Sequence, residues 1–121
     1  MFLIPAASHL ASLKDAKSTV NISAQNVYSA DKGAFTGEVS ASMLVDAGIK
    51  YTLTGHSERR TLFADTSKTV ADRTKAALDK GLKVIFCIGE TLDERKGEKT
   101  AQVCEEMTKA LVEVIEEKEW A

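Results

Sequence analysis

Short apolar runs alternate with longer segments of helical period along this chain, and this alternation constrains the fold more than any other feature. Four runs have the length of a strand, at 2–5, 20–26, 50–54 and 82–88. The last is almost wholly apolar, as a strand covered on both faces should be. The pattern predicts an α/β fold with a parallel sheet and about four βα units.

Three helices are predicted, at 40–47, 67–80 and 100–119. In the last, apolar residues recur from Val103 at helical spacing and form one stripe along the segment. For the helix at 67–80, Asp65 or Thr66 is the expected N-cap, and Gly81 is the expected stop just after its end. The polar, glycine-bearing stretch at 27–39 is longer than a βα connection requires, which favours a functional loop.

Charge and composition argue against several classes of function. The chain has 16 Lys and Arg against 18 Asp and Glu, a formal net charge of −2, so we expect no nucleic-acid partner. The apolar start at 1–5 is too short for a membrane span or a secretory signal, so we expect no membrane association and a cytoplasmic location. Cys87 and Cys104 have no Cys or His nearby at ligand spacing, so we expect reduced thiols, no metal and no cofactor.

The densest polar cluster at a predicted strand end is Gly55-His56-Ser57-Glu58-Arg59-Arg60. His56 directly follows the strand at 50–54 and, with Ser57 and Glu58, would open the next helical turn, at the positive end of its dipole. That position favours a neutral imidazole that donates a hydrogen bond and can polarise a carbonyl. A histidine that only closes a turn is the alternative, but such a turn requires far fewer charged neighbours.

This cluster resembles the catalytic-histidine signature of the triosephosphate isomerase family. Two further stretches resemble the same family in the same order: Gln25-Asn26 followed by Gly33-Ala34-Phe35-Thr36-Gly37-Glu38, and Cys87-Ile88-Gly89-Glu90-Thr91-Leu92. The resemblance covers essentially the whole chain and about half of the family's length, from the second strand through the fifth helix. It implies a (β/α)8 TIM-barrel fold, of which residues 1–121 would form a single partial-barrel domain.

The resemblance also implies residue roles. His56 would be the electrophile in the interconversion of dihydroxyacetone phosphate and D-glyceraldehyde 3-phosphate, a step of glycolysis and gluconeogenesis. Ser57 and Glu58 would support it, Glu58 as a buried carboxylate beside a lysine, although an acidic residue in a first helical turn has a simpler explanation. Cys87 would lie near the active site.

A protruding loop would form the interface of a homodimer through Gly33, Phe35, Thr36 and Glu38, with Arg59 as the inter-subunit ion-pair partner of Glu38. An exposed aromatic at the tip of this loop favours an interface.

The family's lysine, glutamate base and phosphate-binding loops have no counterpart in the printed residues. We therefore expect weak or absent binding of triose phosphate and no turnover by this chain alone. Four strands leave two open sheet edges, so we expect self-association or pairing with the rest of a barrel. Two alternatives stay open: a non-catalytic half-barrel that serves assembly only, and a different βα-barrel enzyme acting on a sugar phosphate.

Overall fold

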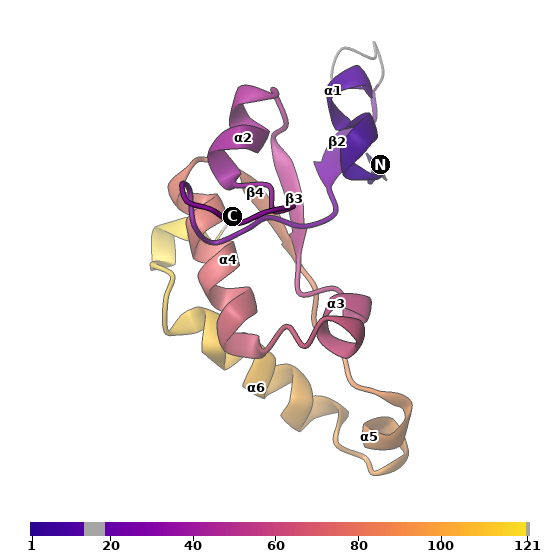
Figure 1. Cartoon of the computed structure of the whole chain (residues 1–121). Helices are drawn as coiled ribbons and strands as arrows, with labels where there is room; N and C mark the ends of the chain where they lie inside the picture. Colours follow the sequence, from indigo (N-terminus) through magenta and orange to yellow (C-terminus); the bar gives the residue numbers. More distant parts are fainter. Residues whose placement is uncertain (14–18, 121) are drawn as a thin grey trace.

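In the computed structural model, which describes residues 1–13 and 19–120, parallel strands alternate with helices along the chain (Figure 1). The strands are β1 (Phe2–Leu3), β2 (Asn21–Ala24), β3 (Tyr51–Thr54) and β4 (Lys83–Phe86). They form one sheet in the order β1-β2-β3-β4, in which Tyr51 pairs with Ser23 on one side and Lys83 on the other. The predicted parallel α/β sheet is confirmed, and its topology is consistent with part of a TIM barrel.

The helices between the strands are α1 (Leu10–Leu13), α2 (Ala41–Asp46), α3 (Ser57–Leu62), α4 (Ser67–Asp79), α5 (Leu92–Lys96) and α6 (Thr100–Val112). Two short 3-10 helices, η1 (Ala7–His9) and η2 (Glu117–Glu119), complete the described elements. The expected ends of α4 are confirmed: the Thr66 side chain accepts a hydrogen bond from the N–H of Thr69, and Gly81, at φ +81°, follows the last turn.

The prediction of one continuous helix at 100–119 was wrong, because α6 ends at Val112. Glu116 is extended, and its N–H donates to the Glu119 carboxylate at 2.7 Å, which starts η2 instead of continuing the helix. The Glu119 carboxylate also accepts from Lys75 of α4 at 2.9 Å. A local side-chain cap and an ion pair to α4 thus replace the backbone hydrogen bonds of a continued helix. The apolar stripe in the sequence continues past the end of α6.

The core lies between the sheet and helices α2 and α4, and its members are buried aliphatic side chains: Leu10, Ala24, Val27, Ala41, Leu44, Ile49, Ala77 and Leu82. Figure 1 shows α4 lying along the sheet and α6 beside it, and α4 contacts β3, β4 and α6. The Thr54 and Thr74 hydroxyls share a buried 2.8 Å hydrogen bond that joins β3 to α4. This contact anchors the end of β3, which leads directly into the candidate site.

The expectation that 82–88 is covered on both faces was also wrong. The last three residues of β4 are only half-buried, and Ile88 is 47% exposed. The reason is the place of β4 at the edge of the sheet, with α4 packed against it. An apolar run therefore predicted the strand but not how fully it is covered.

Candidate active site

The carboxyl ends of three neighbouring strands meet at one cavity. Ile4 follows β1, Gln25 and Asn26 follow β2, and His56 follows β3, and all four border a cavity of about 460 Å³. Its remaining lining residues come from the end of β3 and from α3 and its end: Leu53, Glu58, Arg59, Leu62 and Phe63. In parallel α/β proteins this is the edge where substrates bind, because strand-end side chains and helix N-termini converge there.

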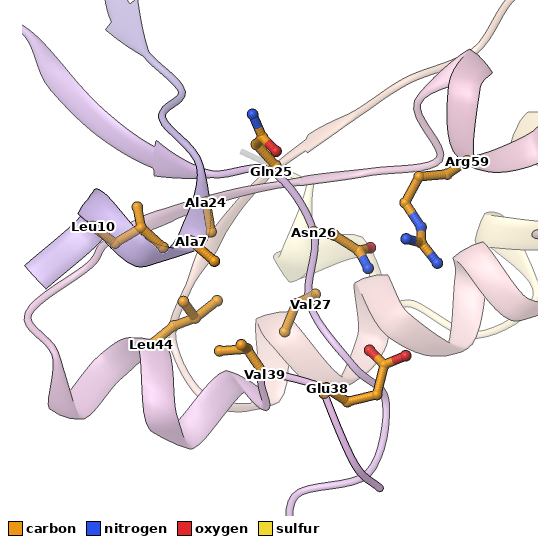
Figure 2. A pocket seen from close by; sticks show the side chains of 11 residues that line it. Ala7, Leu10, Ala24, Gln25, Asn26, Val27, Glu38, Val39, Leu44 and Arg59 are labelled. Carbon is orange, nitrogen blue, oxygen red and sulfur yellow. The ribbon is translucent and has the colours of Figure 1, made fainter. Parts of the chain in front are cut away.

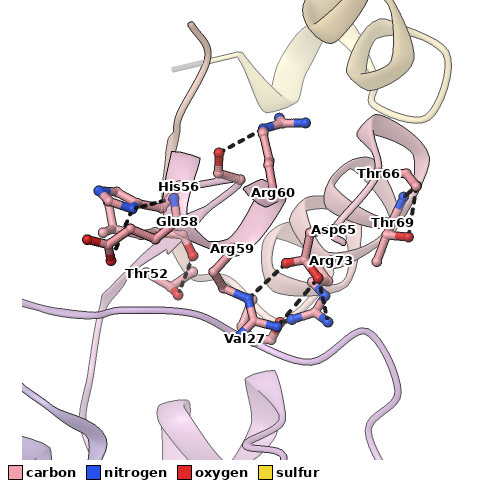
Figure 3. Close-up of polar contacts among 12 residues, drawn as sticks. Val27, Thr52, His56, Glu58, Arg59, Arg60, Asp65, Thr66, Thr69 and Arg73 are labelled. Atoms are coloured by element: carbon pink, nitrogen blue, oxygen red, sulfur yellow. Dashed lines mark hydrogen bonds and ion pairs between the residues drawn. The ribbon is translucent and has the colours of Figure 1, made fainter. Parts of the chain in front are cut away.

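The backbone around His56 fixes where its ring lies. Gly55 has φ +73°, a left-handed conformation that turns the chain sharply at the end of β3. His56 is then the N-cap of α3, and its ring Nδ1 accepts a hydrogen bond from the N–H of Glu58 at 3.3 Å (Figure 3). The ring is 43% exposed, so it lies at the rim of the cavity rather than deep in the core. The predicted position of His56, at the start of a helix after β3, is confirmed.

The bond from Glu58 also assigns the ring tautomer. An Nδ1 that accepts from a backbone N–H carries no proton, so in the neutral ring the proton is on Nε2, which becomes the donor. The Glu58 carboxylate lies 3.7 Å from the same Nδ1, a contact that attracts only a protonated Nδ1. The backbone bond determines the tautomer, because the contact with the carboxylate is long and that carboxylate is 76% exposed to solvent.

The other residues expected near His56 lie in different surroundings. Glu58 borders the cavity but is exposed, so the expectation of a buried carboxylate was wrong in this structure. The cause is its place in the first turn of a six-residue helix at the open rim. Ser57 is exposed beside the ring. Cys87, just after β4, is half-buried, and burial raises the pKa of its thiol, an effect that the Arg60 guanidinium partly opposes.

The predicted interface loop lies in the connection between β2 and α2. Phe35 is 43% exposed and packs on the Tyr28 ring with 4.8 Å between the ring centroids, and a Cβ at Gly33 would collide with the Phe35 ring. Thr36 is exposed at the tip. The loop is therefore shaped around one aromatic side chain that it leaves half in solvent. The interface role of these residues stays a prediction.

A second cavity of about 210 Å³ adjoins the first and shares Gln25, Asn26 and Arg59 with it. Figure 2 shows the side chains of Asn26, Glu38 and Arg59 turned toward the same space. The side-chain oxygen Oδ1 of Asn26 is buried and accepts no hydrogen bond from any described residue. The chain thus places Glu38 and Arg59, the expected ion-pair partners, around one cavity, although the inter-subunit pairing itself stays a prediction.

Two groups of contacts were missed by the sequence reasoning. Asp65 binds Arg59 at 2.8 Å and Arg73 at 3.4 Å, and Arg73 also donates to the carbonyl of Val27 (Figure 3). Arg60 donates to three acceptors near the ends of β3 and β4 and the start of α4. The adjacent arginines were visible as a charged cluster, but nothing local in the sequence identifies partners so far along the chain.

The chemistry of this site is that of hydrogen bonding to a small polar molecule, through an imidazole N–H and the side-chain amides after β2. Across residues 1–13 and 19–120, no three His, Cys, Asp or Glu side chains are grouped so that they could hold a metal ion. In the same ranges, no helix has both the length and the apolar character needed to cross a membrane.

Comparison of the sequence with known proteins points to the same family as the residues of the site. The family model described as triosephosphate isomerase matches residues 1–121. A triosephosphate isomerase of Coprinopsis cinerea is 52% identical over 118 residues, which cover 97% of this chain and 47% of that protein. One from Candida albicans is 53% identical over 97 residues (80% and 39%), and one from Syntrophotalea carbinolica is 47% identical over 100 residues (83% and 40%).

The chain spans about half the length of the curated relatives it matches. The match is nonetheless continuous through all four strands and through His56. With the parallel sheet and the histidine at the end of β3, it shows that this chain belongs to the triosephosphate isomerase family.

Proposed function

We propose that this chain supplies the electrophile-bearing part of an enzyme that interconverts dihydroxyacetone phosphate and D-glyceraldehyde 3-phosphate in glycolysis and gluconeogenesis. The single observation that carries the proposal is the imidazole of His56 at the rim of the strand-end cavity, with Nδ1 bonded to the backbone and Nε2 left as the donor. Residues 1–121 are then one partial-barrel domain.

In this proposal, the Nε2–H of His56 donates to the carbonyl oxygen of the bound triose phosphate. A base removes a proton from the neighbouring carbon, and the negative charge that develops on the oxygen is stabilised by that hydrogen bond. The ring then gives its Nε2 proton to this oxygen and takes the proton of the adjacent hydroxyl, which transfers the negative charge to the second oxygen while the C=C bond stays between the two carbons. The second oxygen then forms the new carbonyl as the protonated base returns a proton to the carbon that carried the original carbonyl, which completes the isomerisation.

The base and the phosphate-binding groups are proposed to come from a segment outside these residues, so the chain alone is expected to be inactive. Loss of a general base costs about 10²- to 10⁴-fold in rate. Loss of substrate positioning raises the activation barrier by up to roughly 7–11 kcal/mol in well-oriented systems. Together these losses exceed what a single well-placed histidine contributes.

A coupled assay on the purified chain tests this expectation. We expect no turnover above that of the buffer, and no difference between the wild type and His56→Ala. Turnover that disappears in His56→Ala would refute the inactivity of the isolated chain. Turnover that is equal in both proteins would point to a contaminating isomerase.

We also propose that the chain associates, with a second copy or with the rest of a barrel, in the cytoplasm. Large apolar side chains are exposed on β1 and just after β4, where Phe2 is 43% and Ile88 is 47% exposed. At the cavity rim, Leu62 is 72% and Phe63 is 63% exposed. Such surfaces and unpaired strand edges favour association. A homodimer would use the loop residues Gly33, Phe35, Thr36 and Glu38 with Arg59.

Sedimentation velocity over a wide range of protein concentrations tests the association. We expect a weight-average mass that rises with concentration, and a smaller rise for the double variant Leu62→Ser/Phe63→Ser. A sharp monomer at all concentrations would contradict it.

The same exposed surfaces favour the second candidate, a half-barrel that serves assembly without catalysis. Binding of a triose-phosphate analogue separates the two. NMR shifts at His56 on titration would favour the isomerase proposal, whereas an unperturbed His56 in a chain that still associates would favour the assembly module.

A further inference from the structure

We propose that Arg60 is a positioning residue for His56, because its guanidinium clamps together the ends of β3 and β4 and the start of α4. The role assigned to His56 comes from the proposed function, whereas the clamp itself is a matter of geometry. Arg60 does not line the strand-end cavity, so it acts on the site through the backbone.

The three bonds of Arg60 reach three separate elements. Nε donates to the carbonyl of Gly55 at 2.9 Å, Nη2 to the carbonyl of Cys87 at 3.4 Å, and Nη1 to the hydroxyl of Ser67 at 3.3 Å. Gly55 follows β3, Cys87 follows β4, and Ser67 is the first residue of α4. Only a guanidinium carries donors in a planar fork that can serve three acceptors at once.

The bond to Gly55 is the link to His56. The Gly55 carbonyl belongs to the peptide unit that joins Gly55 to His56. A hydrogen bond to this oxygen therefore fixes the orientation of the peptide plane that precedes α3. The same glycine is also closely packed: a Cβ there would lie 2.7 Å from Val70, 2.8 Å from Arg60 Nη2 and 3.0 Å from the Cys87 carbonyl. The turn before His56 is therefore held by the hydrogen bond from Arg60 and by the packing of Val70 and Arg60 against Gly55.

The His56 ring depends on this turn because little else holds it. It is 43% exposed, and the one hydrogen bond that a described main-chain group gives to the ring is that from Glu58, at 3.3 Å. If the Gly55–His56 peptide rotates, the N-cap geometry changes and this bond is lost. Once the bond is lost, Nδ1 no longer has a fixed role, and the ring can exchange its proton between the two nitrogens.

The choice of acceptors supports a positioning role. Arg60 is half-buried, and burial lowers the pKa of its guanidinium. Its three hydrogen-bond partners are uncharged, so these bonds fix the relative positions of β3, β4 and α4 without forming an ion pair. A lysine, with one compact ammonium, could not reach all three acceptors together.

The test is ¹⁵N NMR of the ring nitrogens of His56 and of the Glu58 amide in the labelled chain without substrate. Spectra are taken at about pH 8, above the ordinary titration range of histidine. The variants are Arg60→Met and Arg60→Lys. Lys68→Met, which removes an exposed cation of α4, is the matched control. His9→Gln assigns the signals of the second histidine.

For the wild type and Lys68→Met we expect well-separated ring signals, one from a bare Nδ1 and one from a protonated Nε2. In Arg60→Met the two signals should move toward each other, and the Glu58 amide should exchange with solvent roughly 5- to 10-fold faster. Arg60→Lys should fall between these results.

Unchanged ring signals and an unchanged Glu58 exchange rate in a folded Arg60→Met would overturn the proposal. If Arg60→Met does not fold, Arg60→Lys decides it, and wild-type signals in that variant would overturn it equally. Because no substrate is present, a failure of the isomerase proposal would leave this result intact. Conversely, a mobile ring in the variants would support the positioning role of Arg60 without showing that the chain isomerises triose phosphates.

Discussion

Replacing Gly55 by alanine should destabilise the chain through two effects that the structure separates. At φ +73°, an alanine is in the left-handed region, at a cost of about 1–2 kcal/mol. Its Cβ would also lie 2.7 Å from Val70, 2.8 Å from Arg60 Nη2 and 3.0 Å from the Cys87 carbonyl, and overpacking of this kind costs about 1–3 kcal/mol. The two together lower the free energy of unfolding by about 2–5 kcal/mol. With a urea m-value of about 2 kcal/mol/M, the unfolding midpoint should fall by roughly 1–2.5 M.

Gly81→Ala is the matched control for the packing effect. Gly81 has a similar φ of +81°, but a Cβ there meets no atom within 4 Å, so this variant is destabilised by backbone strain alone. Urea unfolding followed by far-UV circular dichroism, at matched protein concentrations, should place Gly55→Ala about 1–3 kcal/mol below Gly81→Ala. Equal midpoints for the two variants would refute the close packing around Gly55.

Two further predictions concern groups near the site. Asp65→Asn should lower the free energy of unfolding by about 3 kcal/mol, because it leaves two arginines without their shared buried carboxylate. The exposed Asp72→Asn should cost less than about 0.5 kcal/mol, and equal losses in urea unfolding would contradict this assignment. Cys87 should react with iodoacetamide more slowly than a free cysteine peptide at neutral pH, since its raised pKa reduces the thiolate fraction. In Cys104→Ser, the rise of this rate with pH should be displaced to higher pH, and a profile matching that of the peptide would contradict it.

The parts of the fold that local signals encode were predictable. Thr66 and Gly81 bound α4 as expected, because an N-cap hydroxyl and a glycine with positive φ act within one helical turn. The four strands lie within the predicted runs, and His56 was identifiable because the strand end and the polar cluster are adjacent in sequence.

The rest depends on contacts that no local pattern contains. Arg60 reaches a carbonyl 27 residues away, and Arg73 reaches one 46 residues away, and both partners come close only after βα crossovers bring strand ends together. Periodicity alone placed the end of α6 too late, because the residues after Val112 make other contacts, such as the ion pair of Glu119 in η2 with Lys75 of α4. The exposure of Glu58 likewise follows from the open rim around α3, not from its neighbours in sequence.

Measuring the tautomer of His56 tests the proposed electrophile most directly, because both the hydrogen bond to the carbonyl oxygen and the proton transfer between the two oxygens use the proton on Nε2. Long-range ¹H–¹⁵N correlation spectra of the wild-type ring, at a pH where histidine is ordinarily neutral, should show a bare Nδ1 and a protonated Nε2. A proton residing on Nδ1, with Nε2 bare, would contradict the proposed electrophile.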